Sequence, residues 1–162
     1  MIDDSASVTE VRLAPGNSSD LDDVMSVMTA AFHPRFGEAW TRSQCAGILP
    51  MSGVSLTVAR DAGAGRPLGF SLSRTIAGEA ELLLLAVIPA FQRRGIARRL
   101  MEQFISGAGT EGAVRVHLEV RDGNPAVGMY RAAGFETVGR RRQYYRGSEG
   151  SRFDALTLAR SL

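Results

Sequence analysis

The chain has 162 residues, a length that suits one domain with one substantial core. Its net charge of +2 is too small to predict nucleic-acid binding, and no apolar run approaches the ~20 residues that span a bilayer. The first residues lack the basic-then-apolar order of a signal peptide, so we expect a cytoplasmic protein without a membrane partner. A single cysteine, Cys45, excludes an internal disulfide, and with only two histidines we expect no metal site.

The N-terminal elements begin after a polar segment. We predict a flexible tail over residues 1–9 and one folded domain over residues 10–162. A short strand is predicted over residues 11–13. Residues 18–20 form a helix N-cap signal, and apolar side chains then recur at helical spacing over residues 21–32.

An aromatic loop and three strands are expected next. Pro34 ends the first helix, residues 32–40 form the loop, and Thr41 caps a short helix that runs to Ile48. Runs of strand character separated by turn residues follow at 54–60, 68–76 and 80–88. The apolar residues of the third run are continuous, which predicts a strand buried on both faces.

The C-terminal half alternates between helix and strand. Helices are predicted at 96–106 and 125–133, and strands at 114–120, 135–145 and 153–159. A strand–loop–helix–strand unit implies a parallel pair with a right-handed crossover, and the hairpins at both ends imply antiparallel pairs. The predicted fold is therefore α/β (α+β), a mixed sheet of about seven strands with about four helices in the order β-α-α-β-β-β-α-β-α-β-β.

A basic, glycine-containing loop joins the buried strand to the following helix. The first N–H groups of a helix have no intrahelical partner and form a site for phosphate oxygens. Gly95 and Ala97 carry no bulky side chain, so a pyrophosphate can approach the backbone closely. An ordinary loop with a turn glycine is the alternative. The P-loop and the dinucleotide fingerprint are excluded, because neither of their glycine patterns occurs here.

The segment Gln92-Arg93-Arg94-Gly95-Ile96-Ala97 resembles the (Arg/Gln)-x-x-Gly-x-(Gly/Ala) pyrophosphate loop of the GNAT acetyltransferase superfamily. Ala86-Val87-x-Pro89 before it and Arg99-Leu100-Met101 after it are similar to the family pattern as well. The resemblance implies acetyl-CoA as co-substrate. The cofactor-binding residues that it implies are Leu85, Ala86, Val87, Gln92, Arg93, Arg94, Gly95, Ile96, Ala97 and Arg98.

The strand over residues 114–121 places a glutamate on its polar face. Val114, Val116, Leu118 and Val120 alternate with Arg115, His117, Glu119 and Arg121. A central strand of an α/β domain is expected to be apolar on both faces, so Glu119 needs a partner, an edge position or a cleft. From alternation alone a structural salt bridge, with Arg121 or Arg115, is one interpretation, and a functional carboxylate is the other.

A second motif extends the resemblance. Residues 117–126 and 129–135 (HLEVRDGNPA and MYRAAGF) are similar to the second GNAT signature, above all to that of the bacterial ribosomal-protein N-terminal alanine acetyltransferases. The resemblance implies Glu119 as general base, Tyr130 as general acid, and Asn124 as a ligand of the cofactor's pantetheine arm. A core aromatic is the alternative for Tyr130.

These roles fit the chemistry of acetyl transfer to an amine. An α-amino group has a reference pKa of ~7.7–8.0 and must lose a proton before it attacks a thioester, a proton that a carboxylate can take. A Tyr hydroxyl can protonate the leaving thiolate, and the Val87 or Ile88 N–H can stabilise the oxyanion. No Ser/Cys–His pair is evident, which favours direct transfer without an acyl-enzyme.

The acceptor residues are predicted less specifically. Tyr144 and Tyr145 resemble the pair that grips the peptide in N-terminal acetyltransferases, and Phe32 and Trp40 belong to a loop that resembles the family's acceptor loop, with Thr41 where Ser is usual and Ile88 in place of an Asp. Glu81 could contact the acceptor ammonium or form a structural ion pair. We expect a protein N-terminus, such as that of a ribosomal protein, as acceptor and a monomer or homodimer. The alternatives are a small-molecule amine and a CoA-binding module without turnover.

Overall fold

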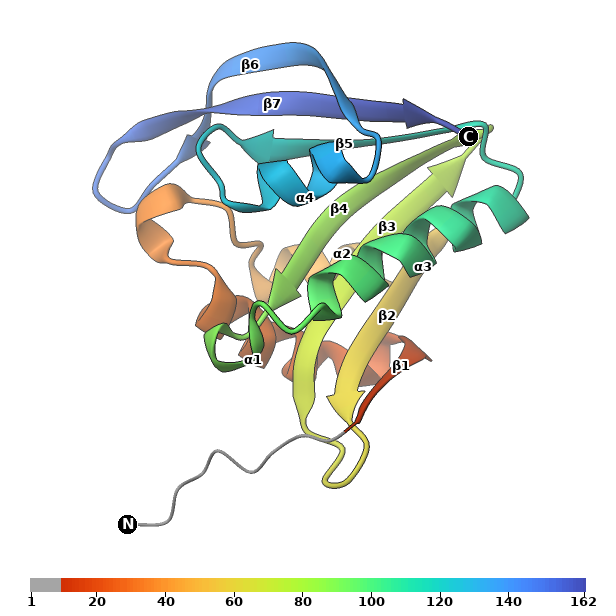
Figure 1. Ribbon diagram of the computed structural model, residues 1–162. Helices are drawn as coiled ribbons and strands as arrows, with labels where there is room; N and C mark the ends of the chain where they lie inside the picture. Colours follow the sequence, from red (N-terminus) through yellow and green to blue (C-terminus); the bar gives the residue numbers. More distant parts are fainter. Residues whose placement is uncertain (1–9) are drawn as a thin grey trace.

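The computed structural model describes residues 10–162, so the predicted tail at 1–9 lies outside the described residues (Figure 1). The strands are β1 (Val11–Gly16), β2 (Val54–Asp61), β3 (Pro67–Ile76), β4 (Glu79–Val87), β5 (Arg115–Arg121), β6 (Glu136–Arg146) and β7 (Arg152–Ser161). The α-helices are α1 (Leu21–Ala31), α2 (Arg42–Ile48), α3 (Ile96–Thr110) and α4 (Ala126–Ala132). The predicted element order and the mixed sheet are confirmed.

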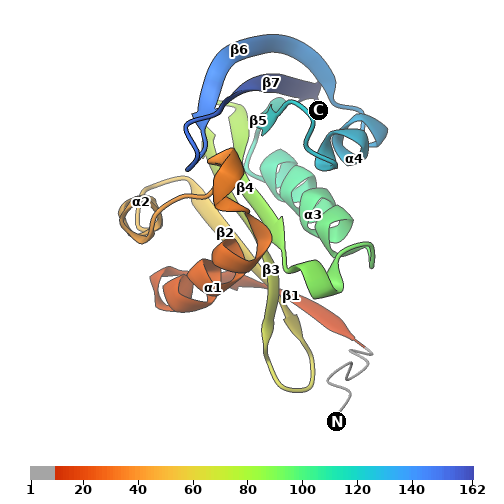
Figure 2. The same ribbon diagram turned by 90° about the vertical axis from the view of Figure 1, so that its left-hand side faces the viewer.

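The seven strands form one sheet in the order β1-β2-β3-β4-β5-β7-β6. β4 and β5 pair in parallel through the α3 crossover, and the other neighbouring strands pair antiparallel. The last strand, β7, inserts between β5 and β6 instead of adding to the edge. Figure 2 shows α1 and α2 on one face of the sheet and α3 and α4 on the other.

Local capping sets the start of the first helix. The Asn17 side chain accepts a hydrogen bond from the Ser19 N–H, and Asp20 bonds back to the Asn17 N–H, so a capping box precedes a 3-10 turn at Ser18–Asp20. The N-cap of α1 is Asp20, within the predicted signal at residues 18–20, and Asn17 caps the 3-10 turn that precedes the helix. Val24, Val27 and Met28 of α1 are buried against the sheet, which explains their helical spacing.

Helix α3 is longer than predicted. It continues past Ser106 to Thr110, although Gly107 and Gly109 each disfavour a helix by about 1 kcal/mol relative to alanine. Ala108 lies between them and is 4% exposed in the core beneath the sheet. Burial of Ala108 stabilises the last turn of α3 more than the low helix propensity of the two glycines destabilises it. This is a tertiary effect, which the spacing of apolar residues in the sequence does not show.

Strands β4 and β5 separate at one end of the molecule. Their pairing runs from Glu79 opposite Arg115 to Leu82 opposite Leu118, and beyond it the strands diverge (Figure 1). A bulge in the β3–β4 ladder reverses the alternation at this point, so Leu82 faces α3 whereas Leu84 faces α1. The predicted burial on both faces holds only in part. Leu82, Leu84, Ala86 and Val87 are buried, whereas Leu83 and Leu85 are only half-buried because they line the gap.

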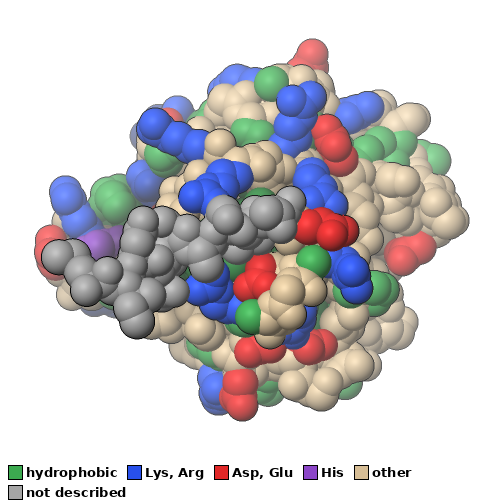
Figure 3. All heavy atoms as spheres, turned by 60° about the horizontal axis from the view of Figure 1, so that its bottom comes forward, with side chains coloured by type: hydrophobic (Ala, Val, Ile, Leu, Met, Phe, Trp, Pro, Cys, Tyr) green, Lys and Arg blue, Asp and Glu red, His purple; other side chains and the backbone are tan. Residues whose placement is uncertain are grey.

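Several arginines pair with carboxylates of other elements. Arg60 lies 3.0 Å from Asp20 and 2.8 Å from Asp23, which ties β2 to α1. On the face shown in Figure 3, basic and acidic side chains are interspersed. Within residues 10–162, no helix combines the length and the apolar character that a membrane span requires.

Candidate active site

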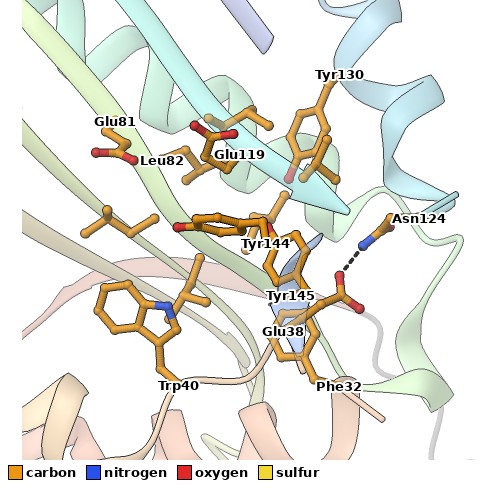
Figure 4. A pocket seen from close by; sticks show the side chains of 15 residues that line it. Phe32, Glu38, Trp40, Glu81, Leu82, Glu119, Asn124, Tyr130, Tyr144 and Tyr145 are labelled. Carbon is orange, nitrogen blue, oxygen red and sulfur yellow. Dashed lines mark hydrogen bonds between the residues drawn. The ribbon is translucent and has the colours of Figure 1, made fainter. Parts of the chain in front are cut away.

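A cleft lies where β4 and β5 separate, and all the predicted catalytic and acceptor residues line it, together with two of the predicted cofactor-binding residues, Leu85 and Asn124 (Figure 4). These are Phe32, Trp40, Glu81, Leu85, Glu119, Asn124, Tyr130, Tyr144 and Tyr145. They come from the loop after α1, from β4 and β5, from the turn before α4, from α4 and from β6. The structure therefore brings together side chains that are more than 100 positions apart in the sequence.

Glu119 projects from β5 into this cleft, with its side chain 14% exposed. Thr157 of β7 donates a hydrogen bond from Oγ1 to Glu119 Oε2 at 2.7 Å, and Arg141 Nε lies 3.2 Å from Oε1. The suggested salt bridges with Arg115 or Arg121 are wrong, because each of these arginines has another carboxylate partner. Glu119 is thus fixed at one oxygen and reachable at the other.

Tyr130 on α4 is 5% exposed and packs edge-to-face against Phe135, with ring centroids 5.9 Å apart. Burial, and after it the negative charge of Glu38, raises the pKa of the Tyr130 hydroxyl. The same two causes raise the pKa of Tyr145. Tyr130 is both a core aromatic and a lining residue of the cleft, so it can present a protonated hydroxyl there across the neutral and alkaline range.

We expect the stability of the protein to fall as the pH rises above about 10. Tyr130 and Tyr145 lose their protons near ~10 in the unfolded chain but at higher pH in the folded protein. The folded state then holds more protons than the unfolded state, so alkali favours unfolding. Urea unfolding between pH 8 and 11 measures this, and the double substitution Tyr130→Phe, Tyr145→Phe should flatten the decline. An unchanged decline in the double variant would contradict the assignment.

Glu38 is a site residue that the sequence analysis missed. Its Oε1 lies 3.1 Å from Arg121 Nε, its Oε2 accepts a hydrogen bond from Asn124 Nδ2 at 2.8 Å (Figure 4), and both members of the ion pair are about nine-tenths buried. The Arg121 guanidinium also lies 3.8 Å from the centroid of the Phe36 ring. The position of Glu38 in the aromatic loop is the only local signal, because its partners are more than 80 residues away.

Asn124, predicted as a ligand of the pantetheine arm, already has partners in the protein. Its Oδ1 accepts from the Ala126 N–H at 2.8 Å, and its Nδ2 donates to Glu38. One N–H of the amide remains for a ligand.

Two walls of the cleft interlock through glycines. The Ser148 N–H donates to the Pro34 carbonyl at 3.0 Å, which joins the β6–β7 turn to the loop after α1. A Cβ on Gly147 would lie 1.7 Å from the Arg35 carbonyl oxygen, and one on Gly37, whose φ is +66°, would lie 2.1 Å from the Arg146 carbonyl oxygen. The loop that carries Phe32 and Trp40 is thereby held against the hairpin that carries Tyr144 and Tyr145.

Gly147→Ala should destabilise the protein by about 1–3 kcal/mol, because the added methyl group forces these two backbones apart. Thermal unfolding measures the change. Gly47→Ala is the matched control: Gly47 lies in α2, and a Cβ there meets nothing within 4 Å, so alanine should be neutral or stabilising. Equal melting temperatures for Gly147→Ala and wild type would show that the two walls are not rigidly joined.

Glu81 lies on the polar face of β4, next to His117 of β5. His117 Nε2 is 3.7 Å from Glu81 Oε2, and its Nδ1 is 3.0 Å from Glu79 Oε2. The Glu81 side chain is 40% exposed and lines the cleft. Glu81 thus lies near a protein partner and also lines the cleft, so a contact with an acceptor stays a prediction.

The loop before α3 has the geometry of an anion cradle. Arg93 has φ +62° and Gly95 has φ +79°, a left-handed conformation that turns successive N–H groups toward one side. The Arg99 N–H bonds to the Gly95 carbonyl at 3.0 Å, so the N–H groups of Ile96, Ala97 and Arg98 precede the first helical bond and are free to donate. A Cβ at Gly95 would meet nothing within 4 Å, so space does not require glycine here. Glycine is favoured because of the positive φ at this position.

The side chains of this loop have separate tasks. Gln92 Nε2 donates to the Val87 carbonyl at 3.0 Å and so ties the loop to the end of β4. The Arg94 guanidinium lies 4.8 Å from the centroid of the Phe91 ring, and Arg98 pairs with Glu102 at 3.1 Å. The Ile96 side chain is 2% exposed in the core, which leaves only its backbone for a ligand. The side chains of Gln92, Arg94, Ile96 and Arg98 therefore already have contacts within the protein. The backbone N–H groups of the loop remain to bind a ligand, and such groups suit a pyrophosphate.

One of the two suggested oxyanion donors is already in use. The Ile88 N–H donates to the Leu68 carbonyl at 2.9 Å, so it is not free. Since successive N–H groups of a strand point to opposite neighbours, the Val87 N–H points toward the side of β5, where the pairing has ended at Leu82. Val87 remains the candidate. Within the described residues, no group of three or more His, Cys, Asp or Glu side chains is arranged to hold a metal ion.

Comparison with known proteins agrees with this geometry. The chain is 39% identical over 95 residues to [ribosomal protein bS18]-alanine N-acetyltransferase of Salmonella typhimurium, a match over 58% of this chain and 64% of that protein. It is 46% identical over 90 residues to N-alpha-acetyltransferase RimI of Mycobacterium tuberculosis, over 55% of this chain and 53% of that protein. The chain thus spans less than two thirds of the length of these relatives.

Solved structures agree over a larger part of the chain. The ribosomal-protein-S18-alanine N-acetyltransferase of Escherichia coli superposes with a TM-score of 0.82 at 26% identity, over 94% of both chains. Ard1 of Thermoplasma volcanium superposes with a TM-score of 0.76 at 26% identity, over 94% of this chain and 97% of that one. Residues 21–135, which include the anion cradle, Glu119 and Tyr130, match the acetyltransferase (GNAT) family. The resemblance of the two motifs is therefore confirmed, and the chain belongs to the GNAT family of acetyltransferases.

Proposed function

We propose that this protein transfers the acetyl group of acetyl-CoA to the N-terminal α-amino group of a protein, with a ribosomal protein as the natural acceptor. The observation that supports this most directly is the position of Glu119, at the meeting point of the acceptor walls and the open strand end that leads to the anion cradle. The names of the Salmonella and Escherichia coli relatives give the acceptor class. Such an acceptor would place the reaction in the cytoplasm.

The cofactor side of the site uses the backbone. The N–H groups from Arg93 to Arg98 would hold the pyrophosphate, the free amide N–H of Asn124 would bind the pantetheine arm, and β4 beyond Leu82 would lie alongside it. Acetyl-CoA supplies the thioester that is transferred.

On the acceptor side, Glu119 Oε1 takes a proton from the ammonium, directly or through water, while Thr157 holds Oε2. The amine nitrogen then bonds to the acetyl carbon, and the carbon–sulfur bond breaks. The Val87 N–H stabilises the negative charge on the acetyl oxygen. Tyr130, which stays protonated, gives its proton to the leaving sulfur, and the acetylated nitrogen passes its second proton, through water, to the Tyr130 oxygen. Glu119 then releases the first proton to solvent. Phe32, Trp40, Tyr144 and Tyr145 would enclose the first residues of the acceptor.

A second candidate is acetylation of a small polyamine. Glu79 and Glu81 form an acidic row on the same sheet face as Glu119, with side chains 44% and 40% exposed, and a second ammonium group could bind there. A CoA-binding module without turnover is less well supported, because binding alone requires neither the carboxylate nor the tyrosine.

Release of free thiol from acetyl-CoA, measured with a panel of acceptors, tests these functions. The panel holds short peptides that begin with Ala, Ser or Met, the Ala peptide with an acetylated N-terminus as control, and spermidine, lysine and kanamycin. We expect turnover with the free Ala peptide and none with its acetylated form, with the +42 Da product confirmed by mass spectrometry. Turnover with spermidine alone would favour the second candidate, and no turnover despite acetyl-CoA binding would favour the module.

A further inference from the structure

Arg141 and Glu119 form an ion pair that differs from the other arginine–carboxylate pair of the site. Arg141 Nε lies 3.2 Å from Glu119 Oε1, yet the Arg141 side chain is 62% exposed. Its guanidinium lies 5.6 Å from the centroid of the Tyr144 ring, beside the cleft. Arg121, by contrast, is 10% exposed in its pair with Glu38. Arg121 is therefore buried in its ion pair, whereas Arg141 is exposed to solvent.

The backbone around Arg141 is fixed. Arg140 donates to Asp122 at 2.7 Å and to Asp154 at 2.9 Å, and the Gln143 N–H donates to the other oxygen of Asp154 at 2.9 Å. β6 bulges between Arg141 and Tyr145, where the register with β7 shifts. The Arg141 side chain can therefore leave Glu119 by rotating about its own bonds, without movement of the strand.

The Glu119 carboxylate keeps its orientation when Arg141 leaves. Thr157 holds Oε2 from the neighbouring strand, and the contact of Arg141 is to Oε1. The ammonium of an acceptor is a small cation that needs the same oxygen. Because the Arg141 side chain is 62% exposed, water can take over its hydrogen bonds when it leaves, and the ion pair resists displacement only weakly.

We propose that the acceptor ammonium displaces Arg141 from Glu119, so that Arg141 is an internal competitor that sets how tightly the charged acceptor binds. This inference rests on the proposed function. Arg141 is thereby a specificity-determining residue: it weakens binding of amines in their ammonium form and leaves binding of neutral amines unchanged.

The other charged or titratable groups around Glu119 do not supply this competition. Glu38 is paired with Arg121, and Glu81 and His117 lie on the adjoining strands in their own cluster. The groups that face Glu119 and Arg141 from the surrounding elements are Glu38, Glu81, His117, Tyr130, Tyr144 and Tyr145. None of these six carries the permanent positive charge of an arginine. Arg121, the other arginine of the site, is paired with Glu38, and Arg141 is the arginine that contacts Glu119.

The experiment compares Arg141→Gln with Arg142→Gln, which removes the same charge one residue further along β6. Acceptor KM is measured with the Ala peptide at pH 6.5, where its amine is mostly ammonium, and at pH 9, where it is mostly neutral. We expect Arg141→Gln to lower KM by about two- to fivefold at pH 6.5, the range typical of exposed ion pairs, and to leave KM unchanged at pH 9. Arg142→Gln should change KM little at either pH.

Binding is measured in parallel without turnover. Trp40 is the single tryptophan and lines the cleft, so its fluorescence reports acceptor binding in the absence of acetyl-CoA. The same pH-dependent difference is expected in Kd. An unchanged or higher Kd for Arg141→Gln at pH 6.5, or an equal fall at both pH values, would overturn the proposal. Failure of the wild type to acetylate the peptide would instead overturn the proposed function, and the Kd comparison would still decide the role of Arg141.

Discussion

Replacing Glu119 by glutamine is expected to lower kcat by about 10²- to 10⁴-fold, the contribution typical of a general base. Glutamine has nearly the same size, and its carbonyl oxygen can still accept the hydrogen bond from Thr157 that holds Glu119. The substitution therefore removes the proton acceptor and leaves the side chain in place. Thiol release from acetyl-CoA at saturating acceptor measures the effect.

The matched control is Glu79→Gln, which removes the same charge from the same sheet face. Glu79 lies 3.3 Å from Arg115, at the paired end of β4 and β5, away from the cleft. The thermal shift caused by acetyl-CoA should be alike in both variants and in wild type, because cofactor binding does not use either carboxylate. If Glu119→Gln kept a kcat within a few fold of wild type, Glu119 would be a structural residue and the proton would have another acceptor.

Replacing Glu38 by alanine should lower the free energy of unfolding by about 3–5 kcal/mol, the cost of leaving a buried charge unpaired. The Arg121 side chain is 10% exposed, and its guanidinium would keep the Phe36 and Phe153 rings and a 3.4 Å contact with the Asp122 carbonyl, none of which neutralises its charge. The Asn124 amide would lose its acceptor as well. In this size range the loss corresponds to a fall in Tm on the order of 10 °C.

A double substitution separates the unpaired charge from the lost packing. Glu38→Leu combined with Arg121→Met removes both charges and keeps apolar volume, so it should be more stable than Glu38→Ala alone. Urea unfolding with unchanged m values is the measurement. Equal stability of Glu38→Ala and wild type would show that solvent already screens this pair.

Glu38→Ala should also raise the acceptor KM more than it changes cofactor binding. Glu38 joins the loop that carries Phe32 and Trp40 to the turn after β5, and without it this wall of the cleft loses its bonds to that turn. The KM for the Ala peptide and the thermal shift with acetyl-CoA can be measured on the same preparation.

Local sequence signals predicted those parts of the fold that depend on neighbouring residues. The Thr41 capping box with Gln44, the helical spacing of α1 and the loop around Gly95 each lie within one element or its flank. Periodicity also placed Glu119 on the polar face of β5. The end of α3 was missed, because burial of Ala108 outweighs the two glycines beside it.

The sequence by itself determined the element order, the anion cradle and the identity of the carboxylate and tyrosine that face the cleft. Only the tertiary structure decided what surrounds them. Thr157 and Arg141 meet Glu119 because β7 inserts between β5 and β6, and Arg121 meets Glu38 because the loop after α1 crosses the open end of the sheet. Such contacts depend on strand order and loop packing. The pattern of residues along the sequence does not show which charged side chains, distant in the chain, are buried next to each other.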